Sequence, residues 1–176
     1  MKVLESDRLI LRLIERRDLL FMLELRNDKR ICEWIIHEPM TFESQVKWFE
    51  NLKHAIYFCI ELKTGERIGI IGLFEISMKH QRAKWTLKIR PDHWRKGYGG
   101  EVVKLFLNYV FNTMNINKIW GDCFSENIAE VNNLRKLGFK EEGIWNDHYF
   151  HKGKFRTAIN FAMTRGEFND AVNENH

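Results

Sequence analysis

The chain has 176 residues, of which 44% are hydrophobic and 13% aromatic, enough to bury the core of one folded domain. No apolar run approaches the roughly 20 residues of a membrane span. Residues 1–8 also lack the apolar stretch of a secretion signal, so we expect a soluble cytoplasmic protein without a membrane partner. The formal net charge of +4 is spread along the chain without a long basic run, which argues against a nucleic-acid partner.

The first half of the chain alternates between strand and helix patterns. The predicted elements, in chain order, are a strand at 9–13, a helix at 18–25, a helix at 41–53, and strands at 56–62, 67–76 and 83–89. Asp18 and Thr41 are residue types that cap helices, and they precede the two helical segments. The last strand is the clearest, because apolar residues alternate with polar ones along its whole length.

The second half predicts two longer helices and a return to strands. Its elements are a helix at 98–114, a strand at 119–124, a helix at 127–136, extended segments at 139–142 and 145–150, and a strand at 155–163. The order of elements predicts one mixed α/β (α+β) domain over residues 1–165. The remaining residues, 166–176, are mostly polar, and we expect them to form a tail.

The three cysteines, Cys32, Cys59 and Cys123, are widely spaced, and they form no CxxC pair. No Cys/His cluster has the spacing of a zinc site either, so we expect no metal in this protein. Cys59 and Cys123 lie in predicted strands and are expected to be small buried residues.

The turn from His93 to Glu101 joins the strand at 83–89 to the helix at 98–114. Gly97 and Gly99 let the backbone come close to a bound group, and free N–H groups at the helix start favour an anion there. Arg95 and Lys96 add positive charge, so the turn predicts a pyrophosphate site. The P-loop and dinucleotide-binding patterns are both missing. A helix that only needs close packing at its start would carry the same glycines.

Four features occur together along the chain: the strand exit at 89–91, the turn from Trp94 to Gly99, Asn127, and the segment Leu137-Gly138-Phe139. This combination resembles the GNAT superfamily of N-acetyltransferases over about Leu9 to Met163. Within it, the chain is similar to the branch of ribosomal-protein N-terminal acetyltransferases and spermidine acetyltransferase. The resemblance implies a central sheet of about seven strands, splayed between the fourth and fifth and flanked by about four helices. It also implies acetyl-CoA as cosubstrate.

The resemblance implies how the donor would be bound. Backbone groups of Leu87 to Ile89 would pair with the pantetheine arm, and N–H groups of the glycine turn would hold the pyrophosphate. The implied cofactor-binding residues are Ile89, Trp94, Arg95, Lys96, Gly97, Tyr98, Gly99, Gly100, Asn127, Arg135 and Lys136. Trp94 stands where the family often has Gln or Arg, which removes one possible side-chain donor.

The implied reaction is direct attack of an amine on the acetyl thioester. It needs a neutral amine, stabilisation of the oxyanion and a route to protonate the leaving thiolate. The backbone N–H of Leu87 is the candidate oxyanion donor. The family frequently places a tyrosine as general acid seven residues after the asparagine, and this chain has Leu134 there. The general acid is therefore unassigned.

Several side chains are candidates for the general base. Glu75 is our first choice, because it lies near the end of a predicted strand that should approach the reactive end of acetyl-CoA. His80 and His148 are titratable alternatives. Asp122 could hold a water molecule or pair with the base.

The acceptor is the least determined part of the sequence interpretation. A polyamine nitrogen, with a pKa of about 10.4, costs roughly 3 kcal/mol more to deprotonate than an α-amine near 8. Glu33, Glu38 and Glu75 could supply some of the carboxylates that a polyamine needs. His37 and Lys84, however, stand where spermidine enzymes tend to have acids.

We therefore expect a peptide N-terminus or an amino group of a nucleotide-linked sugar as acceptor. A polyamine acetyltransferase and a non-catalytic CoA-binding regulatory module remain alternatives. The aromatic hairpin at 145–163 could also pack on a second copy of the chain and form a homodimer.

Overall fold

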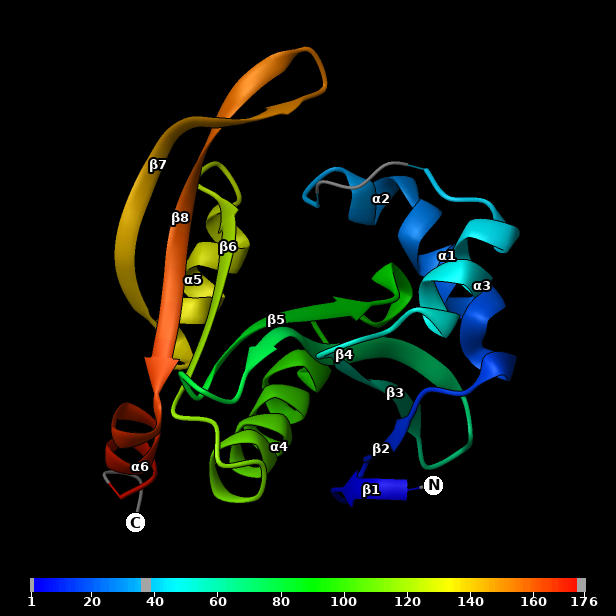
Figure 1. Ribbon diagram of the computed structural model, residues 1–176, viewed down its shortest axis with the longest axis horizontal. Helices are drawn as coiled ribbons and strands as arrows, with labels where there is room; N and C mark the ends of the chain where they lie inside the picture. Colours follow the sequence, from blue (N-terminus) through cyan, green and yellow to red (C-terminus); the bar gives the residue numbers. More distant parts are fainter. Residues whose placement is uncertain (1, 36–38, 174–176) are drawn as a thin grey trace.

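One mixed sheet of eight strands runs through residues 2–35 and 39–173, the part of the chain that the computed structural model describes. Its strand order is β1-β2-β3-β4-β5-β6-β8-β7 (Figure 1). The strands are β1 (Lys2–Glu5), β2 (Leu9–Leu13), β3 (Ile56–Leu62), β4 (Arg67–Ser77), β5 (Arg82–Ile89), β6 (Lys118–Phe124), β7 (Lys140–His151) and β8 (Lys154–Thr164). Neighbouring strands are antiparallel except β5 and β6, which run parallel.

Six α-helices and two short 3-10 helices complete the described chain. The α-helices are α1 (Leu19–Asn27), α2 (Lys29–Cys32), α3 (Phe42–Glu50), α4 (Tyr98–Asn112), α5 (Ile128–Lys136) and α6 (Arg165–Asn173). The 3-10 helices are Arg16–Asp18 and Pro91–His93. None of the helices in this part of the chain is long and apolar enough to cross a membrane.

The sheet opens between β5 and β6. The two strands pair only at Arg82 with Lys118, Ala83 with Ile119 and Lys84 with Trp120. Beyond Lys84 they diverge, and the gap between them widens in Figure 1. These are the fourth and fifth of the strands predicted from the sequence, so the expected position of the splay is confirmed.

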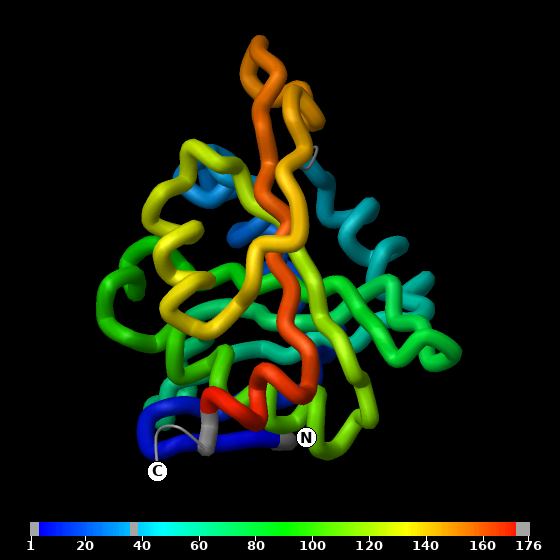
Figure 2. The backbone as a smooth tube through the Cα atoms, turned by 90° about the vertical axis from the view of Figure 1, so that its left-hand side faces the viewer, coloured from blue at the N-terminus to red at the C-terminus, as the bar shows by residue number. Residues whose placement is uncertain are grey.

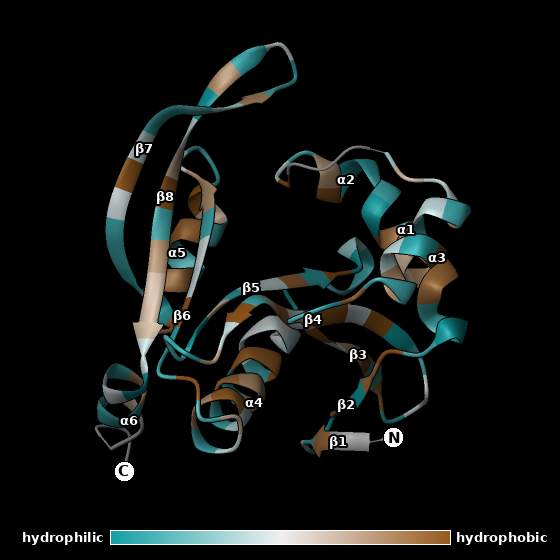
Figure 3. Ribbon diagram, in the orientation of Figure 1, coloured by the Kyte–Doolittle hydropathy of each residue, from teal (hydrophilic) through white to brown (hydrophobic). Residues whose placement is uncertain are grey.

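Two apolar clusters cover the two faces of the sheet. The larger one packs α4 and α5 against one face and contains Phe58, Ile71, Phe106 and Leu134. The smaller one packs α1 against the other face around Ile70 and includes apolar side chains of α3 at its edge. Figure 3 shows the brown, apolar residues concentrated on α4 and the middle strands. Burial on both faces explains why these central strands read as nearly continuous apolar runs.

The mixed fold predicted from the sequence is confirmed, with eight strands in place of about seven and six α-helices in place of about four. β1 and α2 have four residues each, too short for a periodic pattern. The two extended segments at 139–142 and 145–150 form one strand, β7, which is interrupted by register shifts. The polar segment after Arg165 is helical as far as Asn173, because Phe168 is buried and packs on Phe111 at 5.4 Å between ring centroids.

β7 and β8 form a long hairpin that projects from the body of the protein (Figure 2). Ile144, Phe150 and Phe155 expose 61%, 63% and 62% of their surface on it. These are the side chains that the expected contact with a second copy would cover.

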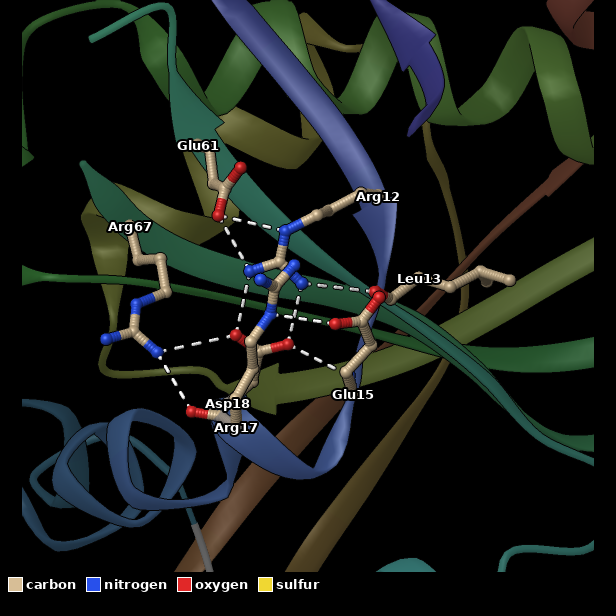
Figure 4. Close-up of polar contacts among 7 residues, drawn as sticks. All are labelled: Arg12, Leu13, Glu15, Arg17, Asp18, Glu61 and Arg67. Atoms are coloured by element: carbon tan, nitrogen blue, oxygen red, sulfur yellow. Dashed lines mark hydrogen bonds and ion pairs between the residues drawn. The ribbon is translucent and has the colours of Figure 1, made fainter. Parts of the chain in front are cut away.

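A buried carboxylate fixes the start of α1 to the sheet (Figure 4). Asp18 is fully buried and accepts hydrogen bonds from Arg12 Nη1 at 2.7 Å and Nη2 at 2.8 Å. Glu15 N also donates to it at 2.8 Å, and Arg12 bonds in addition to Glu61 at 2.7 Å. Burial alone would raise the pKa of Asp18, but the hydrogen bonds from Arg12 and Glu15 lower it below its ordinary value.

Candidate active site

The glycine turn forms an open amide cradle at the start of α4. Gly97 is the N-cap residue, with φ of 81° in the left-handed region that favours glycine. The first helical hydrogen bond runs from Glu101 N to Gly97 O, so the N–H groups of Tyr98, Gly99 and Gly100 precede the helical ladder. Apart from its chain neighbours and the nearby backbone of α4, no described atom lies within 4 Å of the position that a Cβ on Gly100 would occupy. The cradle therefore has donors and space for an anion.

Arg8 adds a guanidinium to this cradle from the other end of the sequence. Its Nη1 donates to Lys96 O at 3.3 Å, and its Cζ lies 4.8 Å from the centre of the Tyr98 ring. It also forms an ion pair with Glu101, the acidic residue in the first turn of α4. Burial would raise the pKa of Glu101, but hydrogen bonds from Ser6 and Arg8 lower it. Arg8 thus offsets the one negative charge beside the cradle.

The edge of β5 that faces the gap carries the backbone groups of alternate residues. Arg90 N donates to Ile68 O of β4 at 2.7 Å. The backbone groups of successive residues in a strand point to opposite edges, so those of Leu87 and Ile89 point away from β4 and into the gap. Trp94 Nε1 donates to Ile89 O at 2.7 Å. The Leu87 N–H and C=O and the Ile89 N–H therefore line the open edge. Trp94 caps the end of that edge with its indole.

Across the gap, Asn127 caps α5. Its side-chain oxygen accepts a hydrogen bond from Glu130 N at 3.3 Å, so the amide nitrogen is the group that can donate to a pantetheine arm. Arg135 and Lys136 lie at the opposite end of α5, about 12 Å along the helix axis from Asn127. The Arg135 guanidinium is 2.6 Å from Glu141 on β7. Leu134 of α5 is 4% exposed and packs in the larger apolar cluster.

A polar cluster lies where β5 and β6 separate. The Asp122 carboxylate is 2.8 Å from Lys84 Nζ, in an ion pair, and accepts a hydrogen bond from Tyr149 OH at 2.9 Å. The Lys84 ammonium also lies 4.7 Å from the centre of the Trp120 ring. Burial first, and then Asp122, raises the pKa of Tyr149, so its phenol stays protonated at neutral pH. Sequence reasoning identified Asp122 as a pairing partner and Tyr149 as one of the aromatic residues that could line an acceptor cleft, but it did not predict the contact between the two.

Glu75 acts electrostatically on Tyr149 of this cluster. It has a positive φ of 52° at the point where the register between β4 and β5 shifts. Its side chain is exposed, and its charge contributes to the raised pKa of Tyr149. His80 is exposed in the turn after β4, and the His148 ring lies 4.5 Å from the Tyr149 ring centre. Glu75 and Tyr149 are thus brought together although they are far apart in the sequence.

An ion pair joins the residue after α2 to the β7–β8 hairpin. Glu33, which follows α2, forms an ion pair with Lys152 at the hairpin tip and lies 4.0 Å from Arg156. Its charge is therefore already matched by the protein's own cations. His37 and Glu38, which bore on the choice of acceptor, lie outside the described residues.

Two of the three cysteines are buried enough to be unreactive. Burial raises the pKa of Cys59 and of Cys123 to about 12, so both thiols are protonated at neutral pH. Within the described ranges, no group of three or more His, Cys, Asp or Glu side chains could hold a metal ion.

Comparison with known proteins identifies the family. The model of the acetyltransferase (GNAT) domain matches residues 8–140, which is most of the chain. The chain belongs to the GNAT acetyltransferase family. It is an acyl-CoA N-acyltransferase that uses acetyl-CoA as cosubstrate, as the sequence resemblance implied. The amide cradle and the open edge of β5 both fit this donor.

Among relatives, spermidine N(1)-acetyltransferase of Escherichia coli K12 is 29% identical over 164 residues, covering 90% of this chain and 87% of that protein. The Vibrio cholerae enzyme of the same name is 30% identical over 168 residues, covering 93% and 96%. The uncharacterized N-acetyltransferase YoaA of Bacillus subtilis is 30% identical over 159 residues, covering 86% and 90%.

A similar solved structure is spermidine N-acetyltransferase from Vibrio cholerae in complex with CoA and spermine. Its TM-score is 0.89 at 26% identity, and the match covers 93% of this chain and 99% of that chain. The fold and the use of a CoA thioester are thus established for the family, and the roles of individual residues remain predictions.

Proposed function

We propose that this GNAT enzyme transfers the acetyl group of acetyl-CoA to the primary amine of a small-molecule acceptor in a ternary complex. The observation that carries the proposal is the continuous donor surface from the open edge of β5 to the amide cradle at α4. The N–H groups of Tyr98, Gly99 and Gly100 bind the pyrophosphate. Ile89 and Asn127 hold the pantetheine arm from the two sides of the gap.

The amine attacks the thioester carbonyl, so a C–N bond forms and the C–S bond then breaks. The Leu87 N–H, which faces the gap, stabilises the oxyanion, and Glu75 takes the proton from the amine. Leu134 offers no proton to the leaving thiolate. A thiol has a pKa of roughly 8.5, so releasing it as a thiolate at pH 7 costs only about 2 kcal/mol. Water can therefore protonate it.

A polyamine is the second candidate acceptor, because the relatives and the similar structure carry the name spermidine acetyltransferase. The charges around β5 favour other acceptors. Glu33 is paired with Lys152, and Asp122 is paired with Lys84. A peptide N-terminus or a nucleotide-linked amino sugar needs fewer free carboxylates than a polyamine does.

A thiol-release assay with acetyl-CoA over a panel of amines tests the proposed function. The panel holds spermidine, a dipeptide and amino sugars with and without phosphate. We expect acetyl-CoA binding in calorimetry and thiol release with at least one small amine. Binding without turnover on any of them would favour a regulatory CoA-binding module, and no binding would contradict both.

The base is tested by Glu75→Gln. The substitution keeps the size of the side chain and removes its ability to take a proton. We expect kcat/KM to fall by about 10²- to 10⁴-fold, the usual contribution of a positioned base, while the Kd for acetyl-CoA stays unchanged. Glu43→Gln, at an exposed position on α3, is the matched control. Wild-type turnover in Glu75→Gln would remove Glu75 from the mechanism.

A further inference from the structure

Lys84 is the last residue of β5 that pairs with β6 before the two strands separate. It stands opposite Phe74 on β4 and opposite Trp120 on β6. Residues that stand opposite each other in neighbouring strands project from the same face of a sheet, so these three side chains lie together. Ala83, which precedes Lys84, packs in the larger apolar cluster with α4. The three side chains therefore lie on the face of the sheet away from α4.

The Lys84 ammonium contacts the kinds of group that bind cations in proteins. Asp122 Oδ1 lies 2.8 Å from it, in an ion pair. The centre of the Trp120 ring is 4.7 Å away and that of the Phe74 ring 5.9 Å, both within the range of a cation–π contact. Tyr149 OH donates a hydrogen bond to Asp122 Oδ2 at 2.9 Å and so fixes the carboxylate. Phe74, Trp120, Asp122 and Tyr149 thus form a cation subsite, and Lys84 fills it.

The cation subsite lies at the end of the gap toward which the donor extends. The amide cradle at α4 follows the other end of β5, beyond Ile89. An arm that starts there and follows the open edge runs toward Lys84. Leu87, the proposed oxyanion donor, is only about 10 Å along the strand from Lys84, and Glu75, the proposed base, directly follows Phe74. An amine that reacts between Leu87 and Glu75 therefore has the cation subsite within reach of its other end.

Lys84 and a second ammonium group on an acceptor would compete for the same carboxylate. The ion pair leaves little room for both, because the side chain of Asp122 is 12% exposed and that of Lys84 is 21% exposed. Two ammonium groups at one carboxylate would also repel each other. A diamine could therefore use Asp122 only by displacing Lys84.

We propose that Lys84 is a specificity-determining residue, whose ammonium fills the cation subsite and thereby excludes acceptors that carry a second ammonium group near the reacting amine. This inference rests on the proposed function, and it narrows the acceptor to amines with a single cationic centre. Spermidine would have to displace Lys84 from Asp122. The same subsite accepts a diamine once the lysine is removed.

The test compares amines of equal chain length with one or two amino groups. The pairs are butylamine with 1,4-diaminobutane and hexylamine with 1,6-diaminohexane, and spermidine is a further probe. Lys84→Ala and Lys84→Ser both empty the cation subsite, so that either can be used if the other does not fold. Lys84→Arg keeps the subsite filled, and the double variant Lys84→Ala/Asp122→Asn removes the carboxylate as well. Lys104→Ala, at an exposed position of α4, is the matched control.

We expect the wild type, Lys84→Arg and Lys104→Ala to favour the monoamine of each pair. Lys84→Ala should raise kcat/KM for a diamine relative to its monoamine by about 10- to 100-fold, the usual effect of one charged hydrogen bond. The double variant should lose this gain. A merely structural role of Lys84 would lower kcat for both amines alike and leave their ratio unchanged.

Binding gives a second readout that does not depend on turnover. In the presence of CoA, 1,4-diaminobutane should raise the melting temperature of Lys84→Ala, because a ligand that binds only the folded state stabilises it. The melting temperatures of the wild type and of the double variant should not change. This shift separates the two proposals: a shift without acetylation of any amine would contradict the proposed function and support the cation subsite.

Three results would overturn the role of Lys84. They are an unchanged ratio of diamine to monoamine turnover in folded Lys84→Ala, no change in the melting temperature of that variant with 1,4-diaminobutane, and spermidine as the preferred acceptor of the wild type.

Discussion

Gly97→Asp is expected to weaken acetyl-CoA binding by about 100-fold or more, because two like charges about 4 Å apart near a protein surface repel by about 4 kcal/mol. The new carboxylate would project beside the N–H groups that precede the ladder of α4. There is space for the side chain, since, chain neighbours apart, the nearest described atom to a Cβ at this position is Arg8 Nη2 at 3.6 Å. The positive φ strains any residue other than glycine by roughly 1–2 kcal/mol, which is less than the usual stability of a folded domain, so the variant should fold. Calorimetric titration with acetyl-CoA measures the loss.

Two controls separate the effect of the added charge from the effect of the backbone conformation. Gly97→Asn has nearly the same size and the same demand for a positive φ, but no charge, so it should lose much less affinity. Gly65→Asp places the same residue in another left-handed position, with φ of 88° in the turn between β3 and β4. It should bind acetyl-CoA like the wild type. An unchanged Kd in folded Gly97→Asp would contradict the pyrophosphate assignment.

The elements that the sequence predicts well are those with a long periodic pattern. The helix expected at 98–114 is α4 at Tyr98–Asn112, and the alternating segment at 83–89 is β5 at Arg82–Ile89. Short or irregular elements carry no such pattern. β7 was predicted as two pieces, and the break between them at 143–144 falls beside the register shift between Glu141 and Gly143, which disturbs the alternation of residues.

The donor site is local in sequence, and the acceptor side is not. The cradle at 97–100 consists of consecutive residues, so glycines and the helix start predict it together. Arg8, which joins the cradle from outside, contacts Glu101 across 93 residues, and on the acceptor side Tyr149 reaches Asp122 across 27. Only the folded sheet brings such residues together.

The function and the stability of this protein depend on different charge clusters. Beside β5, the exposed carboxylate of Glu75 is the proposed base, which serves the reaction and is not part of the buried core. Around β2, the carboxylate of Asp18 is fully satisfied by Arg12 and Glu15. Removing the charge at the first place should lower turnover. Removing one at the second should change the free energy of unfolding.

Asp18→Ala is accordingly expected to lower the free energy of unfolding by about 3–5 kcal/mol, the usual cost of removing one partner of a buried ion pair. The substitution leaves Arg12, 7% exposed, with Glu61 as its remaining carboxylate partner, and it leaves Glu15 N without its acceptor. Urea unfolding at pH 7 measures the change as a lower midpoint at constant m-value. Glu50→Ala is the control, because the side chains of its ion pair with Arg16 are 51% and 66% exposed, and exposed pairs contribute only about 0–1 kcal/mol.

The effect of Asp18→Ala should also depend on pH. Because the pKa of Asp18 is lower in the folded state, its stabilisation is fully present above the ordinary carboxyl pKa of about 3.9 and is lost as the pH falls through the folded value. The difference in unfolding free energy between wild type and Asp18→Ala should therefore be constant from pH 7 to pH 5 and shrink in stronger acid. A difference in unfolding free energy below about 1 kcal/mol at pH 7 would mean that Asp18 contributes no more than an ordinary surface ion pair does. The anchoring of α1 to β2 would then have to come from the apolar contacts of Leu19 and Met22 alone.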